Sequence, residues 1–146
     1  MSKKISLSTV VNTGGRDGEV KSVTGDLNLK TSMAKKEGYT NPEELFAAGL
    51  SACFNGALSF PLQRDGLGDR QRQVRAEVVL LGDLPDTNSL HLAAKLIVSI
   101  EGLSPEETLR YVQETENICP YTKAVKGKCF LSLEHSVRFL LGSSLQ

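Results

Sequence analysis

Polar and apolar residues alternate along several stretches of the chain, and this period-two pattern is typical of half-buried β-strands. The expected strands cover residues 4–12, 20–23, 27–31, 74–82, 89–101 and a segment that begins near 128. A glycine-rich turn, TGGRDGE, follows the first of them. The first three strands therefore fit a meander joined by short turns.

The first expected helix has strong start signals. Asn41 is a favourable N-cap, Pro42 suits the first helical position, and Glu44 has the spacing of a capping box. We expect the helix to run to about Phe60, because the proline at position 61 removes a backbone donor. The polar stretch 64–73 is then expected to be a long loop.

The second expected helix begins at Ser104–Glu107, where a capping residue precedes a proline and two acids. Its apolar and polar residues fall on opposite halves, so it is amphipathic. Pro120 disfavours helical geometry at Cys119 and should end it there. The order is βββ-α-ββ-α-β, which predicts one mostly antiparallel α+β domain over residues 1–146.

The first helix divides into two arcs when its residues are placed at about 100° intervals. The small arc holds Ala48, Gly49, Ala52, Asn55 and Gly56, and the bulky arc holds Phe46, Leu50, Phe54 and Leu58. Another backbone could approach the small arc closely while the bulky arc packs under a sheet. We therefore expect a central helix buried on both sides, with Cys53 at the boundary of the arcs.

Charge and hydropathy argue against nucleic-acid binding and membrane insertion. The formal net charge is zero, and short basic clusters such as Lys35-Lys36 and residues 70–75 are interpreted as solvated loops. The N-terminal stretch lacks the apolar core of a secretory signal. No uninterrupted apolar run reaches the ~18–20 residues of a membrane span, since Ser51 and Asn55 interrupt the longest one. A soluble cytoplasmic protein is expected.

Three cysteines, Cys53, Cys119 and Cys129, are too few for a disulfide framework, and none form a CxxC motif. The two histidines, His91 and His135, are far apart in the sequence, so no metal site is expected. In a reducing compartment any disulfide should be transient and chemical.

Cys53 has two interpretations. A free buried cysteine commonly behaves as a small hydrophobe, and burial raises the pKa of a thiol unless a cation compensates. Arg16, in the GGRDG turn, could be that cation, or it could be an exposed turn residue. Likewise Glu43 could be an ordinary acid at a helix start, and Cys119 an ordinary core residue. Each residue taken singly favours the structural interpretation.

Three motifs in combination favour a catalytic interpretation. They are TGGRDG (13–18), TNPEELFAAGLSACFNGAL (40–58) and ICPYTKAVKG (118–127). In this order they resemble the organic hydroperoxide resistance proteins, the Ohr branch of the OsmC/Ohr family, over nearly the whole chain. FAAG, CF and CPY are more similar to Ohr than to OsmC. The resemblance implies an OsmC/Ohr-like fold, with antiparallel sheets around a buried central helix, and an intertwined homodimer.

The resemblance also implies roles for individual residues. Cys53 matches the peroxidatic cysteine and Cys119 the resolving one, while Arg16 and Glu43 match the polar part of the site. Cys129 matches no catalytic position and is expected in the core. The implied protein is an antioxidant enzyme of the oxidative-stress response that reduces organic, lipid-type hydroperoxides to alcohols. It has no bound cofactor, and a dihydrolipoyl-type dithiol on another protein regenerates it.

Thiol chemistry adds geometric expectations. A Cys53 sulfenic acid can form a disulfide with Cys119 only if the two Cα atoms come within roughly 7 Å. Arg16 would lower the pKa of the Cys53 thiol, and Glu43 would orient its guanidinium. The apolar side chains expected to favour a bulky organic substrate over hydrogen peroxide are Phe46, Leu50 and Phe54.

Two questions stay open at this level. Glu43 and Cys53 are ten residues apart, or ~15 Å along a straight helix, so either the helix bends or Glu43 serves a site on another chain. The chain could also be an OsmC-like peroxidase with a broader peroxide range, or a catalytically silent ligand-binding or stress protein of the same fold. A pure binding module, however, has no need of both Cys53 and Cys119.

Overall fold

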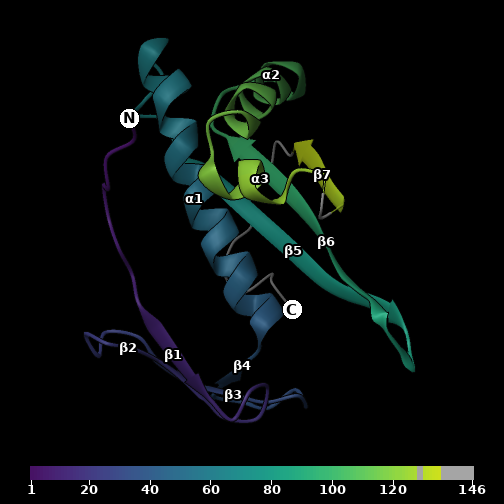
Figure 1. Ribbon diagram of the computed structural model, residues 1–146. Helices are drawn as coiled ribbons and strands as arrows, with labels where there is room; N and C mark the ends of the chain where they lie inside the picture. The colour runs from purple at the N-terminus through teal and green to yellow at the C-terminus, as the bar shows by residue number, and fades with distance from the viewer. Residues whose placement is uncertain (128–129, 136–146) are drawn as a thin grey trace. The chain divides into compact units, whose positions relative to one another are not determined.

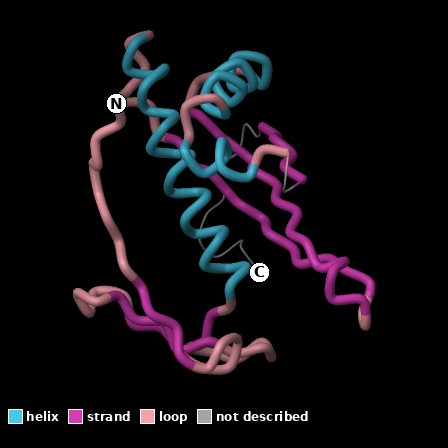
Figure 2. Tube along the Cα trace, viewed as in Figure 1, coloured by secondary structure: helices cyan, strands magenta, loops and turns pink. Residues whose placement is uncertain are grey.

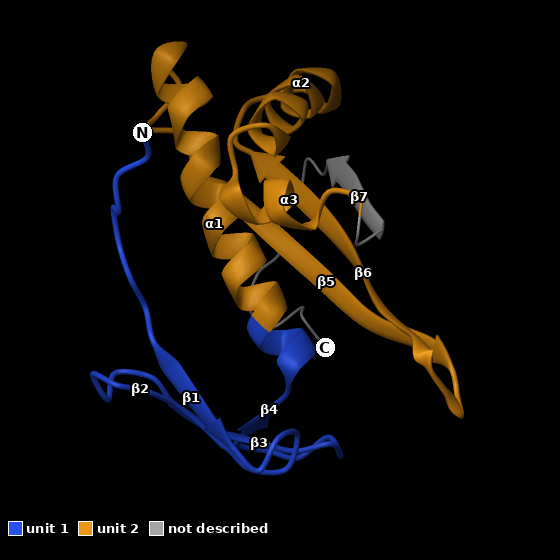
Figure 3. Cartoon of the chain, viewed as in Figure 1, with its two compact units in different colours: residues 1–45 blue, residues 46–146 orange. Residues whose placement is uncertain are grey.

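The computed structural model describes residues 1–127 and the backbone of residues 130–135. The chain divides into two compact units, residues 1–45 and 46–146 (Figures 1 and 3). The elements follow the predicted order with two short additions, the strand β4 and the helix α3 (Figure 2). The expectation of a single domain over residues 1–146 stays a prediction, and Cys129 lies outside the described residues.

The first unit contains a four-stranded sheet in the order β1-β2-β3-β4. Its strands are β1 (Val10–Thr13), β2 (Glu19–Ser22), β3 (Asn28–Thr31) and β4 (Tyr39–Thr40). β1–β2 and β2–β3 pair in antiparallel fashion, whereas β3–β4 is parallel. The predicted meander of three strands is therefore present, with β4 added at its edge.

The first strand is shorter than predicted. Residues 4–9 alternate in polarity, but β1 begins only at Val10, which pairs with Ser22. One further backbone bond, from Val23 N–H to the Thr9 carbonyl (3.1 Å), extends this pairing. Beyond it the chain of β2 turns away at Gly25 (φ +84°), so the earlier residues find no partner strand within the part of the chain that the structure describes. Alternation alone does not make a strand without a hydrogen-bonding partner.

Helix α1 (Pro42–Arg64) begins as predicted and ends one turn later than predicted. The side-chain oxygen of Asn41 accepts from the backbone N–H of Glu44 (2.8 Å), as an N-cap does. Pro61 lies inside the helix and is buried. The helix ends where Gly66 adopts φ +74° and Leu67 N–H reaches back to the Leu62 carbonyl (2.7 Å). The glycine, and not the proline, is the stop signal.

The second unit holds a three-stranded sheet in the order β5-β6-β7. β5 (Arg72–Asp83) and β6 (Asp86–Ile100) form a long antiparallel hairpin, and β7 (Phe130–His135) pairs with β6 in parallel. The predicted loop 64–73 is shorter than expected because β5 begins at Arg72. The arginines around it are not simply solvated, since Arg70 donates to the Glu101 carbonyl (3.1 Å).

One side of α1 forms the centre of the core in this unit. Four of its residues repeat at i, i+4 spacing and are fully buried, which gives a continuous apolar stripe: Leu50, Phe54, Leu58 and Leu62. They belong to one cluster with side chains of β6, among them Leu96 and Val98, and with Val112 of the next helix. The prediction of burial on both sides is wrong for this single chain, because Ala48, Ala52 and Gly56 of the small arc are exposed.

By length and composition, α1 could cross a membrane, since its 18-residue window reaches a mean hydropathy of 1.4. The sequence analysis expected no such stretch, because it counted Ser51 and Asn55 as interruptions, whereas averaging over a window absorbs them. A core helix can meet the same criterion. In this structure a third (33%) of the window is buried, and that part includes the apolar stripe.

Helix α2 (Pro105–Glu116) starts at the predicted cap, and the structure adds a capping box there. Ser104 Oγ accepts from Glu107 N–H, and Glu107 Oε2 accepts from Ser104 N–H (2.8 Å). The helix ends before Cys119, as expected. A second short helix, α3 (Pro120–Val125), then starts at the same proline that stops α2, because proline is well suited to a first helical position.

Candidate active site

Cys53 lies in the middle of α1 and is partly buried at the edge of the core cluster. Its neighbours along the bulky side of the helix, Leu50 and Phe54, have no exposed surface. The thiol therefore borders an apolar interior while it retains some access from outside. A reactive cysteine requires such access, and it also requires a group that stabilises the thiolate.

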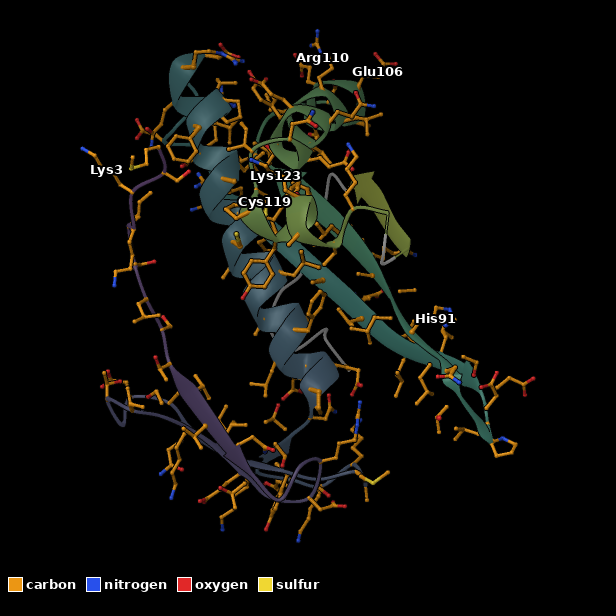
Figure 4. All side chains as sticks on the ribbon, viewed as in Figure 1. Lys3, His91, Glu106, Arg110, Cys119 and Lys123 are labelled. Atoms are coloured by element: carbon orange, nitrogen blue, oxygen red, sulfur yellow. The ribbon has the colours of Figure 1, made fainter. Side chains whose placement is uncertain are left out.

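Cys119 lies at the junction of α2 and α3, where it is the N-cap residue of α3 (Figure 4). Its backbone is extended (φ −63°, ψ 120°), and its N–H donates to the Thr115 carbonyl at the end of α2 (2.9 Å). The residue is fully buried. Pro120 fixes this geometry because the residue before a proline is driven towards extended dihedral angles.

The structure brings the two thiols together. Cys119 Sγ donates to Cys53 Sγ at 3.4 Å, although 66 residues separate them in the sequence. Both cysteines are in the free, reduced form. The sulfurs are thus in van der Waals contact, which places them within reach of a disulfide.

The surroundings of Cys53 act on its pKa in both directions. Burial raises the pKa of the thiol, the backbone N–H of Tyr121 lowers it by hydrogen bonding to the sulfur, and the Cys119 side chain raises it. The balance is a pKa above the ordinary value. Within this unit, Cys53 therefore needs further stabilisation to become a thiolate at neutral pH.

An aromatic pair covers α1 close to the thiols. The rings of Phe46 and Tyr121 meet edge to face with centroids 6.3 Å apart. Gly49 lies beneath them, since a Cβ at this position would come within 2.6 Å of the Tyr121 hydroxyl. Phe46 is partly buried and Tyr121 is 41% exposed. These two rings offer a partly open apolar surface to a ligand.

Leu50 and Phe54 were expected to contact a substrate together with Phe46. Both are fully buried in the core, so in this structure they offer no surface to a ligand. Their side chains instead form the interior against which Cys53 lies. Tyr121 was missed by the sequence analysis, although it belongs to the CPY motif; the short helix that carries it was not predicted.

Arg16 and Glu43 form an ion pair within the first unit. Arg16 Nη2 lies 2.6 Å from Glu43 Oε1, and Nη1 lies 3.1 Å from Oε2, so the pair is bidentate. The hydrogen bond from Arg16 lowers the pKa of the Glu43 carboxyl, and its effect exceeds the opposing effect of burial. The same bond raises the pKa of Arg16. The glutamate orients the guanidinium as the sequence analysis expected.

The turn that carries Arg16 is held by several side chains. Thr31 Oγ1 donates to the Gly15 carbonyl (3.0 Å) and accepts from Gly18 N–H (2.9 Å). Asp17 Oδ1 accepts from Met33 N–H (2.9 Å). At Gly18 a Cβ would lie 1.8 Å from the Thr13 carbonyl oxygen, so only glycine fits. Arg16 is therefore presented from a rigid loop and not from an adaptable one.

Among the described residues, no group of three His, Cys, Asp or Glu side chains could hold a metal ion. His91 lies on β6, where its Nδ1 is 2.7 Å from the Ser89 carbonyl. The chemistry that the described residues offer is thiol chemistry.

Comparison with known proteins gives a consistent result. Residues 34–134 match the family described as OsmC-like protein. The organic hydroperoxide resistance protein OhrA of Bacillus subtilis is 39% identical over 140 residues, which is 92% of this chain and 98% of the relative. The organic hydroperoxide resistance protein-like 2 of Staphylococcus epidermidis is 36% identical over 139 residues, with 92% and 97% covered.

Solved structures show the same likeness. An organic hydroperoxide resistance protein from Legionella pneumophila superimposes with a TM-score of 0.83 at 31% identity, covering 92% of this chain and all (100%) of that one. OhrB of Bacillus subtilis gives a TM-score of 0.82 at 29% identity, with 91% and 100% covered. The predicted fold is confirmed, and the chain belongs to the OsmC/Ohr family.

Proposed function

We propose that this protein is a thiol-dependent peroxidase that reduces organic hydroperoxides to alcohols, with Cys53 as the peroxidatic cysteine and Cys119 as the resolving one. The observation that carries the proposal is the 3.4 Å separation of the two sulfur atoms. Two reduced cysteines from distant elements meet at the edge of an otherwise apolar core. The names of the relatives, which are organic hydroperoxide resistance proteins, support the same reaction class.

The reaction has two steps in the protein. The Cys53 thiolate attacks the terminal oxygen of ROOH, the O–O bond breaks, and the alkoxide leaves and takes a proton to give ROH, while Cys53 becomes a sulfenic acid. The Cys119 thiol then condenses with it. The S–O bond breaks, water leaves, and a Cys53–Cys119 disulfide remains. The peroxide gains the two electrons that the two thiols lose.

Arg16 is proposed to stabilise the Cys53 thiolate. Burial raises the pKa of this thiol, so a cation is needed to populate the nucleophile at neutral pH. Arg16 keeps its charge at any relevant pH, and its pairing with Glu43 fixes the orientation of the guanidinium. Glu43 is then a positioning residue that acts through Arg16.

The proposed substrate is a bulky, apolar hydroperoxide. The half-open rings of Phe46 and Tyr121 offer an organic group a surface to pack on, and burial of each methylene group is worth ~0.8 kcal/mol. Hydrogen peroxide has no such group and would gain nothing from this surface. Leu50 and Phe54 would contribute indirectly, because they keep the interior beside Cys53 apolar.

Regeneration requires an external dithiol, because the disulfide must receive two electrons and no cofactor is proposed to be bound. A dihydrolipoyl group on another protein is the proposed donor. Its vicinal thiols would open the disulfide by exchange and close into their own ring. The reaction is placed in the cytoplasm, where such dithiols are kept reduced.

A homodimer is also proposed. Three residues of the small arc of α1 are exposed, namely Ala48, Ala52 and Gly56. Phe60, one turn further along the helix, is 65% exposed. Such a surface would let a second chain approach the helix closely and bury the phenylalanine. Sedimentation at micromolar concentration tests this, and a species of 15.8 kDa, the mass of one chain, would contradict it.

One experiment tests the central proposal. Reduced protein is mixed with one equivalent of cumene hydroperoxide, and its disulfides are mapped by mass spectrometry. We expect a Cys53–Cys119 bridge, loss of two thiols per chain, and one equivalent of cumyl alcohol. Unchanged thiols, or a bridge to Cys129, would contradict the proposal. Repeating the reaction with hydrogen peroxide separates an organic-selective enzyme from one with a broader peroxide range.

A further inference from the structure

The turn between α2 and α3 contains a buried hydroxyl that the proposed mechanism does not use. Thr122 is fully buried, and its Oγ1 lies 2.7 Å from the Glu116 carbonyl oxygen and 3.0 Å from that of Cys119. A hydroxyl carries one proton, so it donates to one of these acceptors at a time. Glu116 is the last residue of α2, and Cys119 precedes α3. Thr122 therefore ties the end of one helix to the start of the next.

Cys119 is held on both sides of its Cα atom. Its N–H donates to the Thr115 carbonyl (2.9 Å), and its carbonyl accepts from the N–H of Lys123 (3.1 Å) as well as from the Thr122 hydroxyl. Lys123 lies on α3 in the same turn as Cys119 (Figure 4). Once the backbone is fixed, only the χ1 angle remains to move the sulfur. The hydroxyl thus contributes to the placement of the Cys119 thiol through the Cys119 backbone.

We propose that Thr122 is a positioning residue for Cys119, and that its hydroxyl holds the α2–α3 turn so that the resolving thiol reaches the Cys53 sulfenic acid ahead of a second peroxide. This inference rests on the proposed peroxidase function and concerns its second step. The Thr122 hydroxyl bonds to backbone carbonyls and not to the reacting sulfurs, so it acts through the backbone of Cys119.

Two reactions compete for the sulfenic acid. In condensation, Cys53–SOH and Cys119–SH give the disulfide and water. In overoxidation, Cys53–SOH and a second ROOH give Cys53–SO₂H and ROH, and the sulfinic acid does not return to the thiol under ordinary conditions. Condensation depends on the placement of Cys119, whereas overoxidation depends on peroxide concentration. The ratio of the two products therefore reports the positioning of Cys119 in the folded protein.

The test compares four proteins. Thr122→Val keeps the side-chain shape and removes the hydroxyl, whereas Thr122→Ser retains the hydroxyl. Thr108→Val is the matched control, because Thr108 is as deeply buried (1% exposed) on α2 but is not part of the turn. Each of the three variants, and the wild type as the fourth protein, is treated with 1 to about 100 equivalents of cumene hydroperoxide. Mass spectrometry then gives the disulfide and sulfinic fractions at Cys53.

We expect Thr122→Val to reach half overoxidation at about tenfold lower peroxide than the wild type, since losing a buried hydrogen bond costs on the order of one factor of ten in an equilibrium or rate. The rate of the first step, followed by consumption of the first equivalent of peroxide, should not change. Thr122→Ser and Thr108→Val should behave as the wild type does. Thr122→Ala, which also lacks the hydroxyl, serves if the valine variant does not fold.

Three outcomes would overturn the role of Thr122. These are a wild-type product ratio in the variants without the hydroxyl, an equal shift in Thr108→Val, or a failure of Thr122→Ser to restore the ratio. If the wild type itself forms no Cys53–Cys119 bridge, the proposed function fails first and this role fails with it. The two failures are therefore distinguished by the wild-type sample alone.

Discussion

The two compact units each hold one pair of side chains from distant parts of the sequence, and the two pairs are built on different physics. In residues 1–45, Arg16 and Glu43 are 27 residues apart and meet as charges, with side chains 38% and 17% exposed. In residues 46–146, Cys53 and Cys119 are 66 residues apart and meet as neutral thiols at the edge of the core. Hydrogen bonds set the geometry of the Arg16–Glu43 pair, whereas packing of the helices sets the geometry of the thiol pair.

This difference predicts which substitutions will disturb each pair. An ion pair that is partly exposed adds little to stability, but it fixes the direction of a guanidinium. The thiol pair adds almost no directional bonding, and its geometry depends on the elements that carry it. Removing the charge of Arg16 should therefore alter the reactivity and the pKa of Cys53. Loosening the turn between α2 and α3 should instead alter the ratio of disulfide to sulfinic acid.

The largest effect is expected when either thiol is removed. Cys53→Ser should lower peroxide turnover by about 1,000-fold or more, equivalent to ~4 kcal/mol of activation free energy, because no nucleophile remains. Cys119→Ser should still consume the first equivalent of peroxide rapidly but should not sustain turnover, because the sulfenic acid has no resolving partner and is overoxidised by further peroxide. Stopped-flow peroxide consumption distinguishes the two. Equal loss in the first turnover would contradict the assigned order of the cysteines.

A smaller effect is expected from the charged pair. If Arg16 stabilises the thiolate, Arg16→Gln should raise the apparent pKa of Cys53 by roughly one to three units. The measurement is the pH dependence of alkylation by iodoacetamide in a Cys119→Ser background. Removing a cation disfavours the anion, so the profile should move to higher pH. Arg110→Gln, on the exposed side of α2, is the control and should cause no shift.

An unchanged alkylation profile in Arg16→Gln would contradict the proposal that Arg16 stabilises the Cys53 thiolate. The Tyr121 backbone N–H, which lowers the pKa of the Cys53 thiol, would then be the principal stabilising group that the structure identifies for the thiolate.

The smallest effect concerns stability. The pKa of Glu43 is lowered in the folded state, so its pairing stabilises the protein above the ordinary glutamate pKa of about 4.3 and the contribution is lost as pH falls through the lower folded pKa. Glu43→Gln should therefore reduce the free energy of unfolding at pH 7 by about 0.5–1 kcal/mol, a value already limited by solvent screening. Urea denaturation at pH 7 and at about pH 3 should show the difference shrinking.

The control for this comparison is Glu19→Gln. Glu19 pairs with Lys21 at 3.0 Å on the same sheet, but both side chains are substantially exposed (42% and 51%). We expect almost no change in stability at either pH. A loss as large as that in Glu43→Gln would mean that general surface charge, and not the bidentate geometry, accounts for the effect.

The regular elements were predictable because local rules decide them. The capping residues Asn41 and Ser104 mark the true helix starts, and alternation locates β2, β3, β5 and β6 to within a few residues. Predictions failed where a tertiary partner overrides local preference. Pro61 stays inside α1 because the turn around it is packed in the core, and residues 4–9 form no strand because no neighbouring strand among the described residues reaches them.

The candidate site divides in the same way. The motifs identified four residues whose chemistry fits together, but spacing could not place Cys119 at Cys53 or add Tyr121 and Thr122 to their surroundings. These last two lie on a helix of six residues, which is too short to show an apolar period. Leu50, Phe54 and Phe46 were predicted alike as substrate contacts, although burial leaves only Phe46 of the three partly open.

Residue type and local conformation suffice to identify the reactive groups and the local geometry that presents them: an arginine in a glycine turn, a glutamate in the first turn of a helix, and cysteines in a helix and before a proline. These depend on residue type, capping and dihedral preference, which act over a few positions. Packing in three dimensions sets the 3.4 Å separation of the two sulfurs, the burial that opposes ionisation of Cys53, and the exposure of one face of α1. Those properties depend on which elements far apart in the sequence pack together and exclude water. Capping and dihedral preferences act over a few residues and do not determine that packing.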